Sequence, residues 1–335
     1  MESPITGKEM KLVMEPAVLS FRKEKFEVVY HYYLCEDSKE QFTDDVLDTI
    51  NLNQVYNQYR EKYGIPFPEE IREVREQYGV SASKMSTILG FGTNQYRLYE
   101  TGEVPSVANG RLILAIKEPD DFIKQVRASE HLLDSTEVKK LVQKAEKLIE
   151  VRQHNLWNLL LVERIFRNES PNAFSGYRKP DFEKIAQVIR FLSDGRDDIN
   201  KTKLNKLLFY ADFGCFRKTG NSITGITYRA IPLGPVPAEY DKLYMKLADD
   251  DLIQIKQKLI KDYYADVFQG LVGFDASNFS PFEIEVLQFV KEKFCHLTTN
   301  QIVEISHDES AWIQNQENRD LINYQKYAFG LKHYH

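Results

Sequence analysis

The chain has few cysteines and no hydrophobic run long enough to cross a membrane. Only three cysteines occur among its 335 residues, far apart, at Cys35, Cys215 and Cys295. This argues against a disulfide framework and fits a reducing compartment, so we expect a cytoplasmic protein. The longest apolar run, residues 159–162, is far shorter than the roughly 20 residues that span a bilayer. Residues 1–10 lack the basic and apolar regions of a signal peptide.

An excess of positive charge is also lacking. The formal net charge is −6, and residues 65–127 hold eight Lys and Arg against nine Asp and Glu. Phosphate neutralisation supplies most of the non-specific affinity for DNA. A DNA-binding surface would therefore need local clustering, for example of Lys84, Arg97 and Arg111, doubled in a dimer. We expect any DNA binding to be modest and sensitive to salt.

Familiar catalytic and metal-binding motifs are absent too. No GxSxG, HExxH or Walker-type GxxxxGK[S/T] occurs. Ser306, His307 and Asp308 are consecutive, so their side chains diverge by about 100° on a helix and cannot form a triad. The acidic residues 249–251 fit a solvated loop better than a metal cluster. We expect no enzymatic activity.

What is present is mostly helix-forming sequence with small strand-like segments, which predicts an α+β protein that is mostly α. We expect strands at 25–34 and 224–231, a rigid bend at 233–237 and a partly strand-like segment at 252–272. Helices are expected at 44–63, 69–78, 81–89, 93–100, 107–116, 120–126, 135–166, 182–192, 203–216 and 238–247. Capping boxes at Ser280 with Glu283, and at Thr298 with Gln301, predict two further helices.

These segments predict four parts. They are a β-rich module at 1–64, a helix-turn-helix domain at 65–128, a connecting or dimerising helix at 129–170 and an α-rich domain with a small sheet at 171–335. The turn-forming residues of 168–180 indicate a linker. A connector and a dimer-forming helix are equally compatible with the apolar spacing of 135–166.

The most informative stretch is GFGTNQYRLYETGEVPS at residues 90–106. A glycine-broken turn precedes a short polar helix that carries Thr93, Asn94, Gln95 and Arg97. Asn, Gln and Arg make paired hydrogen bonds to base edges, and a recognition helix presents its first turns to the major groove. These four residues, with Lys84 as a phosphate contact, are our candidate DNA-binding residues. Glu100 is expected to pair with Arg72 or Arg75 on the preceding helix.

The N-terminal module has the shape of a zinc ribbon that has lost its ligands. Ser3 and Thr6 occupy one pair of ligand positions, and Cys35 and Ser38 occupy the other. Structural zinc needs four Cys or His ligands, and His31 would add only one. We expect no metal and no cofactor, and a module held together by packing.

On these residues, 1–128 resemble antitoxins of the MqsA type, which join a zinc ribbon to an Xre-like helix-turn-helix. The resemblance rests on the remnants SPIT and CEDS and on residues 90–106. It departs from the family pattern at Ala82 and Leu98, where that family often has Gln and Arg. The resemblance implies a DNA-binding module, similar in frame and altered in sequence preference.

Residues 175–330 resemble the Panacea domain of SocA-type antitoxins. The resemblance is carried by LNKLLFYADFGCFRKTGNSITGITYRAIPLGPVPAEYDKLY and by EISHDESAWI. It implies that this domain neutralises a protein toxin by direct contact, and some relatives act as protease adaptors. Because Tyr and Arg are enriched at interface hot spots, we expect Tyr210, Arg217, Tyr228 and Arg229 at the toxin contact. Four apolar residues are expected in the core: Leu204, Leu207, Leu208 and Trp312.

The two resemblances together predict an antitoxin of a type II toxin-antitoxin system, a homodimer that also represses its own promoter. The partners expected are a protein toxin and operator DNA, with no membrane. The alternative is a transcription regulator whose C-terminal domain senses another ligand or acts as a protease adaptor. An enzyme is the third possibility.

Overall fold

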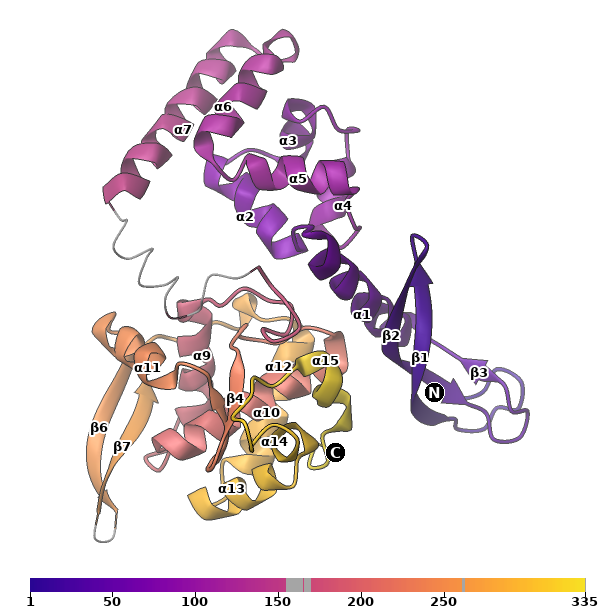
Figure 1. Cartoon of the computed structure of the whole chain (residues 1–335), viewed down its shortest axis with the longest axis vertical. Coiled ribbons are helices and arrows are strands. Elements are labelled where there is room, and N and C mark those ends of the chain that lie inside the picture. Colours follow the sequence, from indigo (N-terminus) through magenta and orange to yellow (C-terminus); the bar gives the residue numbers. More distant parts are fainter. Residues whose placement is uncertain (155–164, 166–169, 261–262, 335) are drawn as a thin grey trace. The chain divides into compact units, whose positions relative to one another are not determined.

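The computed structural model describes residues 1–154, 165, 170–260 and 263–334. Within that part, the protein is mostly α-helical with three small antiparallel sheets (Figure 1), which confirms the predicted fold class. The chain forms two compact units, Met1–Tyr56 with Pro171–His335, and Asn57–Ser170. The four predicted domain boundaries stay predictions. Among the described residues no helix combines the length and the apolar character needed to cross a membrane.

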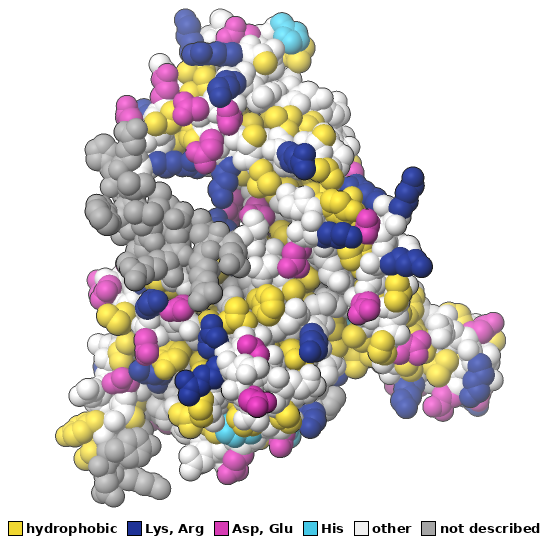
Figure 2. Space-filling view, in the orientation of Figure 1, with side chains coloured by type: hydrophobic (Ala, Val, Ile, Leu, Met, Phe, Trp, Pro, Cys, Tyr) yellow, Lys and Arg dark blue, Asp and Glu magenta, His cyan; other side chains and the backbone are white. Residues whose placement is uncertain are grey.

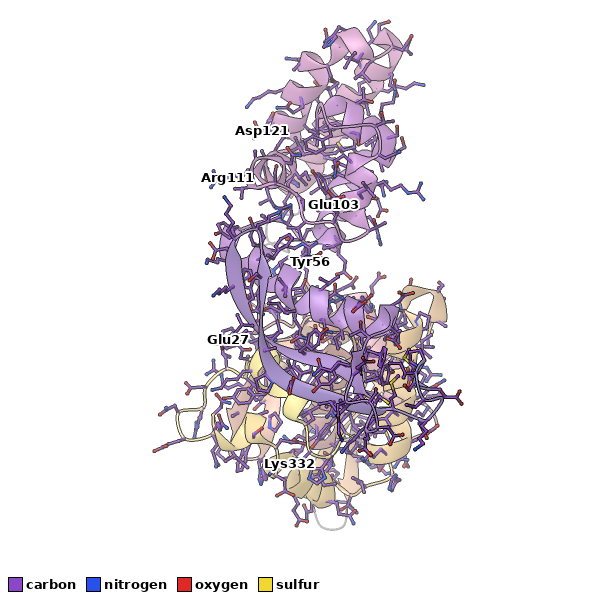
Figure 3. All side chains as sticks on the ribbon, turned by 90° about the vertical axis from the view of Figure 1, so that its right-hand side faces the viewer. Glu27, Tyr56, Glu103, Arg111, Asp121 and Lys332 are labelled. Atoms are coloured by element: carbon purple, nitrogen blue, oxygen red, sulfur yellow. The ribbon has the colours of Figure 1, made fainter. Side chains whose placement is uncertain are left out.

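The first unit begins with a three-stranded sheet. Strands β1 (Lys11–Phe21) and β2 (Glu24–Leu34) form a long antiparallel hairpin, and β3 (Gln41–Phe42) pairs with the end of β2. The hairpin is visibly curved (Figure 3). Its two-residue turn uses Arg22 and Lys23 at φ 49° and 70°, the left-handed conformation that suits the twist of a hairpin. Strand β2 confirms the prediction for 25–34. Strand β1 was not predicted; it contains Pro16, which an edge strand tolerates.

Strand β3 pairs with only the last two residues of β2. Helix α1 (Asp45–Tyr63) covers the rest of that edge of β2. The amide of Gln54 accepts from the Val29 N–H (2.9 Å) and donates to the Val29 carbonyl (2.8 Å). The amide of Asn51 does the same at His31, at 2.8 and 2.9 Å. Both amides are buried, and each makes the pair of hydrogen bonds that the backbone of a neighbouring strand would otherwise make. The sheet is thereby fixed to α1.

The second unit is a bundle of short helices. They are α2 (Pro68–Tyr78), α3 (Ala82–Ile88), α4 (Gln95–Glu100), α5 (Val107–Ala115), α6 (Pro119–Ala128), a 3₁₀ turn at Glu130–Leu132 and α7 (Ser135–His154). Ser81 caps α3 as predicted, accepting from the Lys84 N–H. Tyr78 stacks on Phe122 with ring centroids 3.6 Å apart. The predicted pair is formed between Arg75 Nε and Glu100 Oε1, at 2.5 Å.

Helix α7 contributes to the core of this unit. Leu141 and Ala145 are buried with the side chains of α2, α3 and α6, and Val142 and Leu148 pack against them. The apolar stripe of α7 is therefore used, over its described length, inside its own chain. The rest of the long helix predicted at 135–166 lies largely outside the described residues.

The C-terminal part of the first unit surrounds one helix, α10 (Lys201–Thr219), in which residues 203–216 are all buried. Around it lie α9 (Phe182–Ser193), α11 (Tyr240–Asp249), α12 (Pro281–Phe294), α13 (Thr299–His307), α14 (Ser310–Ile313) and α15 (Tyr324–Tyr327) (Figure 1). Strands β6 (Ile253–Ile260) and β7 (Tyr263–Gly270) form a hairpin. Both predicted capping boxes, before α12 and α13, are present. Leu204, Leu207 and Leu208 are fully buried, as predicted, whereas Trp312 is half-buried.

One local prediction is wrong. Residues 233–237 were expected to be a rigid bend, but Gly234–Pro237 forms strand β5, which pairs with β4 (Tyr228–Ile231) in register Arg229 with Val236. Pro235 and Pro237 are tolerated because the sheet has only two strands, so each has an edge. Gly234 has φ +95°, and a Cβ there would lie 2.5 Å from Ser306 Oγ. Glycine is thus required where the hairpin meets α13.

Candidate functional site

A buried carboxylate organises the centre of the C-terminal domain. Asp212 of α10 is fully buried and accepts four hydrogen bonds. Its Oδ1 accepts from the N–H groups of Ile223 (2.9 Å) and Thr224 (2.8 Å), and its Oδ2 from the hydroxyls of Thr224 (2.5 Å) and Tyr228 (2.7 Å). Burial raises the pKa of Asp212, whereas the four donors favour its ionised form. The carboxylate fastens the loop after α10 and strand β4 to the helix.

Two more ionisable groups are sealed beside it. Glu309 accepts from the hydroxyl of Tyr210 (3.3 Å) and from the N–H groups of Lys332 (2.8 Å) and His333 (3.2 Å). Lys206 donates to the Pro235 carbonyl at 3.1 Å, and burial lowers the pKa of its ammonium group to about 7. Glu309 and Lys206 have no exposed surface. The sequence did contain a signal for both residues, because each is a charged residue within one of the two segments that carry the Panacea resemblance.

The residues predicted to contact a toxin do not form one surface. Tyr210 and Tyr228 are fully buried, with hydroxyls bound to Glu309 and Asp212, so they cannot contact a partner in this structure. Arg217 and Arg229 are half-buried. The reason is that the tyrosines lie on apolar stripes of α10 and β4, where their rings pack and only their hydroxyls need partners. We drop both tyrosines from the contact.

Four of the five residues predicted to contact DNA lie at or just before α4, and the fifth, Lys84, lies on α3. Thr93, Asn94 and Arg97 are exposed, whereas Tyr96 and Tyr99 of the same helix are buried in the core of the second unit. Asn94 precedes the helix without using its side chain as a cap. A short helix thus buries one face and presents polar side chains on the other. This is the arrangement that a recognition helix requires.

Two of the predicted DNA contacts are already engaged within the chain. Gln95 Nε2 donates to Glu103 Oε1 at 2.8 Å, and Lys84 Nζ lies 2.9 Å from Glu137 Oε2. On the face of the molecule in Figure 2, basic and acidic side chains are interspersed, with no large basic patch. Arg111 of α5, labelled in Figure 3, is exposed. DNA binding stays a prediction.

The four positions that the zinc-ribbon resemblance predicted as ligand positions do converge. Thr6 Oγ1 lies 3.5 Å from Cys35 Sγ, and hydrogen bonds from Ser3, Ser38 and Thr6 lower the pKa of the Cys35 thiol to about 6. Among the described residues no group of three or more His, Cys, Asp and Glu is placed to hold a metal. Hydroxyls here contact the sulfur directly. That the module folds without zinc stays a prediction, which elemental analysis of the purified chain would test.

Comparison with known proteins adds one result for the C-terminal domain. No curated protein and no solved structure matches the chain. A family model does match, over the region that holds α10, the β4–β5 hairpin, α12 and α13. The resemblance predicted for the N-terminal half stays a prediction. Residues 204–313 match the family described as "Antitoxin SocA-like, Panacea domain".

Proposed function

We propose that this chain is the antitoxin of a type II toxin-antitoxin system, which neutralises a protein toxin by direct contact in the cytoplasm. The observation that carries the proposal is the Panacea match over residues 204–313, since that family's printed description is that of an antitoxin. The match covers the elements around α10. The part of the chain that binds the toxin is therefore proposed to include this domain.

The chemistry of the matched region supports contact over catalysis. Its notable ionisable groups, Lys206, Asp212 and Glu309, have no exposed surface and are held by hydrogen bonds within the domain. A general acid or base must come within hydrogen-bond reach of a substrate. Asp212 and Glu309 bind backbone N–H groups of their own domain instead, and we propose that the domain catalyses no reaction.

The proposal is tested by expressing the product of the adjacent gene with and without this chain. We expect that product to stop growth by itself, and growth to return when the full-length chain is co-expressed. The Asp308→Asn variant, which changes an exposed carboxylate, should restore growth as well as the unchanged chain does. An adjacent product that is harmless, or that remains toxic beside the full-length chain, would contradict the proposal.

We further propose that α4 enters the major groove of the chain's own promoter, in a homodimer, and so represses the operon. Losing one bidentate base contact costs about 1–3 kcal/mol, which is roughly 5- to 150-fold in affinity. Asn94→Ala and Arg97→Ala are each expected to weaken promoter binding by amounts in this range, measured by fluorescence anisotropy at fixed salt. Arg127→Ala removes an exposed arginine of α6 and should change affinity less than threefold.

The double variant with both Asn94→Ala and Arg97→Ala decides the placement of α4. If it binds the promoter as tightly as the unchanged chain, α4 does not read DNA. Lys84→Ala should instead lower the dependence of affinity on salt by about one phosphate contact, and by less if Glu137 keeps the ammonium engaged.

A further inference from the structure

An apolar groove in the first unit is built from segments far apart in the sequence. We define it by Leu12 and Met14 of β1, Val46 of α1, Arg217 of α10, and Phe282 and Phe289 of α12. The cavity has a volume of about 410 Å³, within the range of specific ligand sites. The register of the sheet explains part of it, because Met14 lies opposite His31 and both line the groove.

The rim of the groove is exposed and hydrophobic. Leu12, Met14, Val46 and Phe282 expose 47%, 36%, 48% and 40% of their surface, the values of residues outside a core. Single exposed apolar side chains are ordinary, but four around one cavity form a contiguous patch of the kind that binds other proteins. Beside this patch, β1 has no strand partner on its outer edge within the described residues. Such an edge favours contact with another chain.

One of the two cations that line the groove forms no ion pair within the described residues. Lys218 on its wall forms an ion pair with Glu285. Arg217 donates to the Leu331 carbonyl at 2.9 Å and forms no ion pair with a carboxylate in the described part of the chain. Burial lowers its pKa. Glu309 acts on this guanidinium electrostatically and raises its pKa, but no carboxylate of the described residues forms an ion pair with it, so its N–H groups remain complementary to an added carboxylate.

The floor also holds polar atoms without partners. His31 Nε2 and Tyr334 Oη belong to residues that line the groove, are buried, and make no hydrogen bond to any residue that the structure describes. His31 Nδ1 lies 2.8 Å from the Val29 carbonyl, so Nδ1 carries the proton and Nε2 is an acceptor. Buried polar atoms are nearly always paired. Hydrogen-bond capacity therefore remains at the base of an apolar cavity.

We propose that this groove is the toxin-binding site, and that it takes a segment of the toxin with a large apolar side chain next to an Asp or Glu carboxylate. The apolar side chain enters between β1 and α12, and the carboxylate pairs with Arg217. This inference rests on the proposed antitoxin function and names the surface that performs it. It differs from the contact expected from sequence, since of those four residues only Arg217 is retained.

The test measures the affinity of the full-length chain for the purified product of the adjacent gene by titration calorimetry. Met14→Lys places a charge in the groove, and Phe282→Ser removes part of its wall. Each is expected to lower affinity about thirtyfold or more, the effect of a hot-spot residue. Val18→Lys, on the same face of β1, and Met245→Ser, on α11, are matched controls that are at least as exposed and lie outside the groove. Both should stay within about twofold.

Arg217→Gln removes the positive charge and retains an amide donor on a shorter side chain, so it tests the pairing with a carboxylate. We expect about tenfold weaker binding. Thermal melting and light scattering should show that all variants remain folded and keep the oligomeric state of the unchanged chain.

Any other outcome overturns one specific element of the proposal. If Met14→Lys and Phe282→Ser bind like the unchanged chain, the groove is not the site, although the antitoxin function stands. If only Arg217→Gln is neutral, the carboxylate is wrong. A change of oligomeric state in the groove variants would assign the surface to a second copy of this chain. If the unchanged chain does not bind at all, the proposed function fails together with the site.

Discussion

Replacement of Asp212 by alanine is expected to lower the free energy of unfolding of the first unit by roughly 4 kcal/mol or more. The substitution leaves four buried donors without an acceptor, two backbone N–H groups and the hydroxyls of Thr224 and Tyr228. Each unsatisfied buried group costs about 1–3 kcal/mol, so the total exceeds roughly 4 kcal/mol. Domains of this size are stable by only about 5–15 kcal/mol. Urea unfolding followed by circular dichroism measures the loss.

A neighbouring carboxylate supplies the control. The side chain of Asp308 is 66% exposed and pairs with His333, so Asp308→Ala should change the free energy of unfolding by less than about 0.5 kcal/mol. Asp212→Asn keeps one acceptor oxygen and should fall between the two. If Asp212→Ala unfolds at the same urea concentration as Asp308→Ala, the carboxylate does not organise the domain.

Lys206→Met is expected to stabilise the protein, and to do so most at neutral and acidic pH. Burial lowers the pKa of Lys206 from 10.5 to about 7, so the folded state releases a proton that the unfolded state holds up to about pH 10.5. Between these values the stability of the unchanged chain rises with pH, by about 1.4 kcal/mol per pH unit from this group alone. Below pH 7 the penalty is constant and largest; above pH 10.5 it vanishes.

Melting curves at pH 6.5, 8 and 9 measure this dependence. The advantage of Lys206→Met over the unchanged chain should shrink by roughly 2 kcal/mol between pH 7 and 9, less any cost of leaving the Pro235 carbonyl unpaired. Lys242→Met, which removes an exposed amine that pairs with Glu239, is the control melted at the same three pH values. An advantage that grows with pH would have the wrong sign for a buried amine.

Local features of the fold could be predicted where one residue type has one structural use. The hydroxyls of Ser81, Ser280 and Thr298 cap helices as their spacing indicated. Glu100 pairs with an arginine of α2 because a carboxylate on a buried helix face needs a cation. The apolar stripe of α10 is buried, although its burial on every side exceeds what the stripe alone required.

Long-range features could not be predicted because their signals are ambiguous in one dimension. Asn51 and Gln54 are unremarkable polar residues of a helix until β2 is placed beside them. Tyr210 and Tyr228 are of a residue type that is common at interfaces. A tyrosine whose hydroxyl has a buried partner is equally suited to a core. The groove combines β1, α1, α10 and α12, which are brought together only by the pairing of residues 1–56 with 171–335.

The most direct test of the account is whether the purified full-length chain inhibits the purified product of the adjacent gene by stoichiometric binding. If the chain neutralises its toxin by direct contact, we expect inhibition to be complete at a fixed molar ratio. It also predicts a toxin of unchanged mass, and toxin activity that returns when the complex is dissociated in urea and the toxin refolded. If the chain inactivates the toxin at a molar amount far below that of the toxin, or alters the mass of the toxin, it acts as a catalyst. Either result would contradict neutralisation by direct contact.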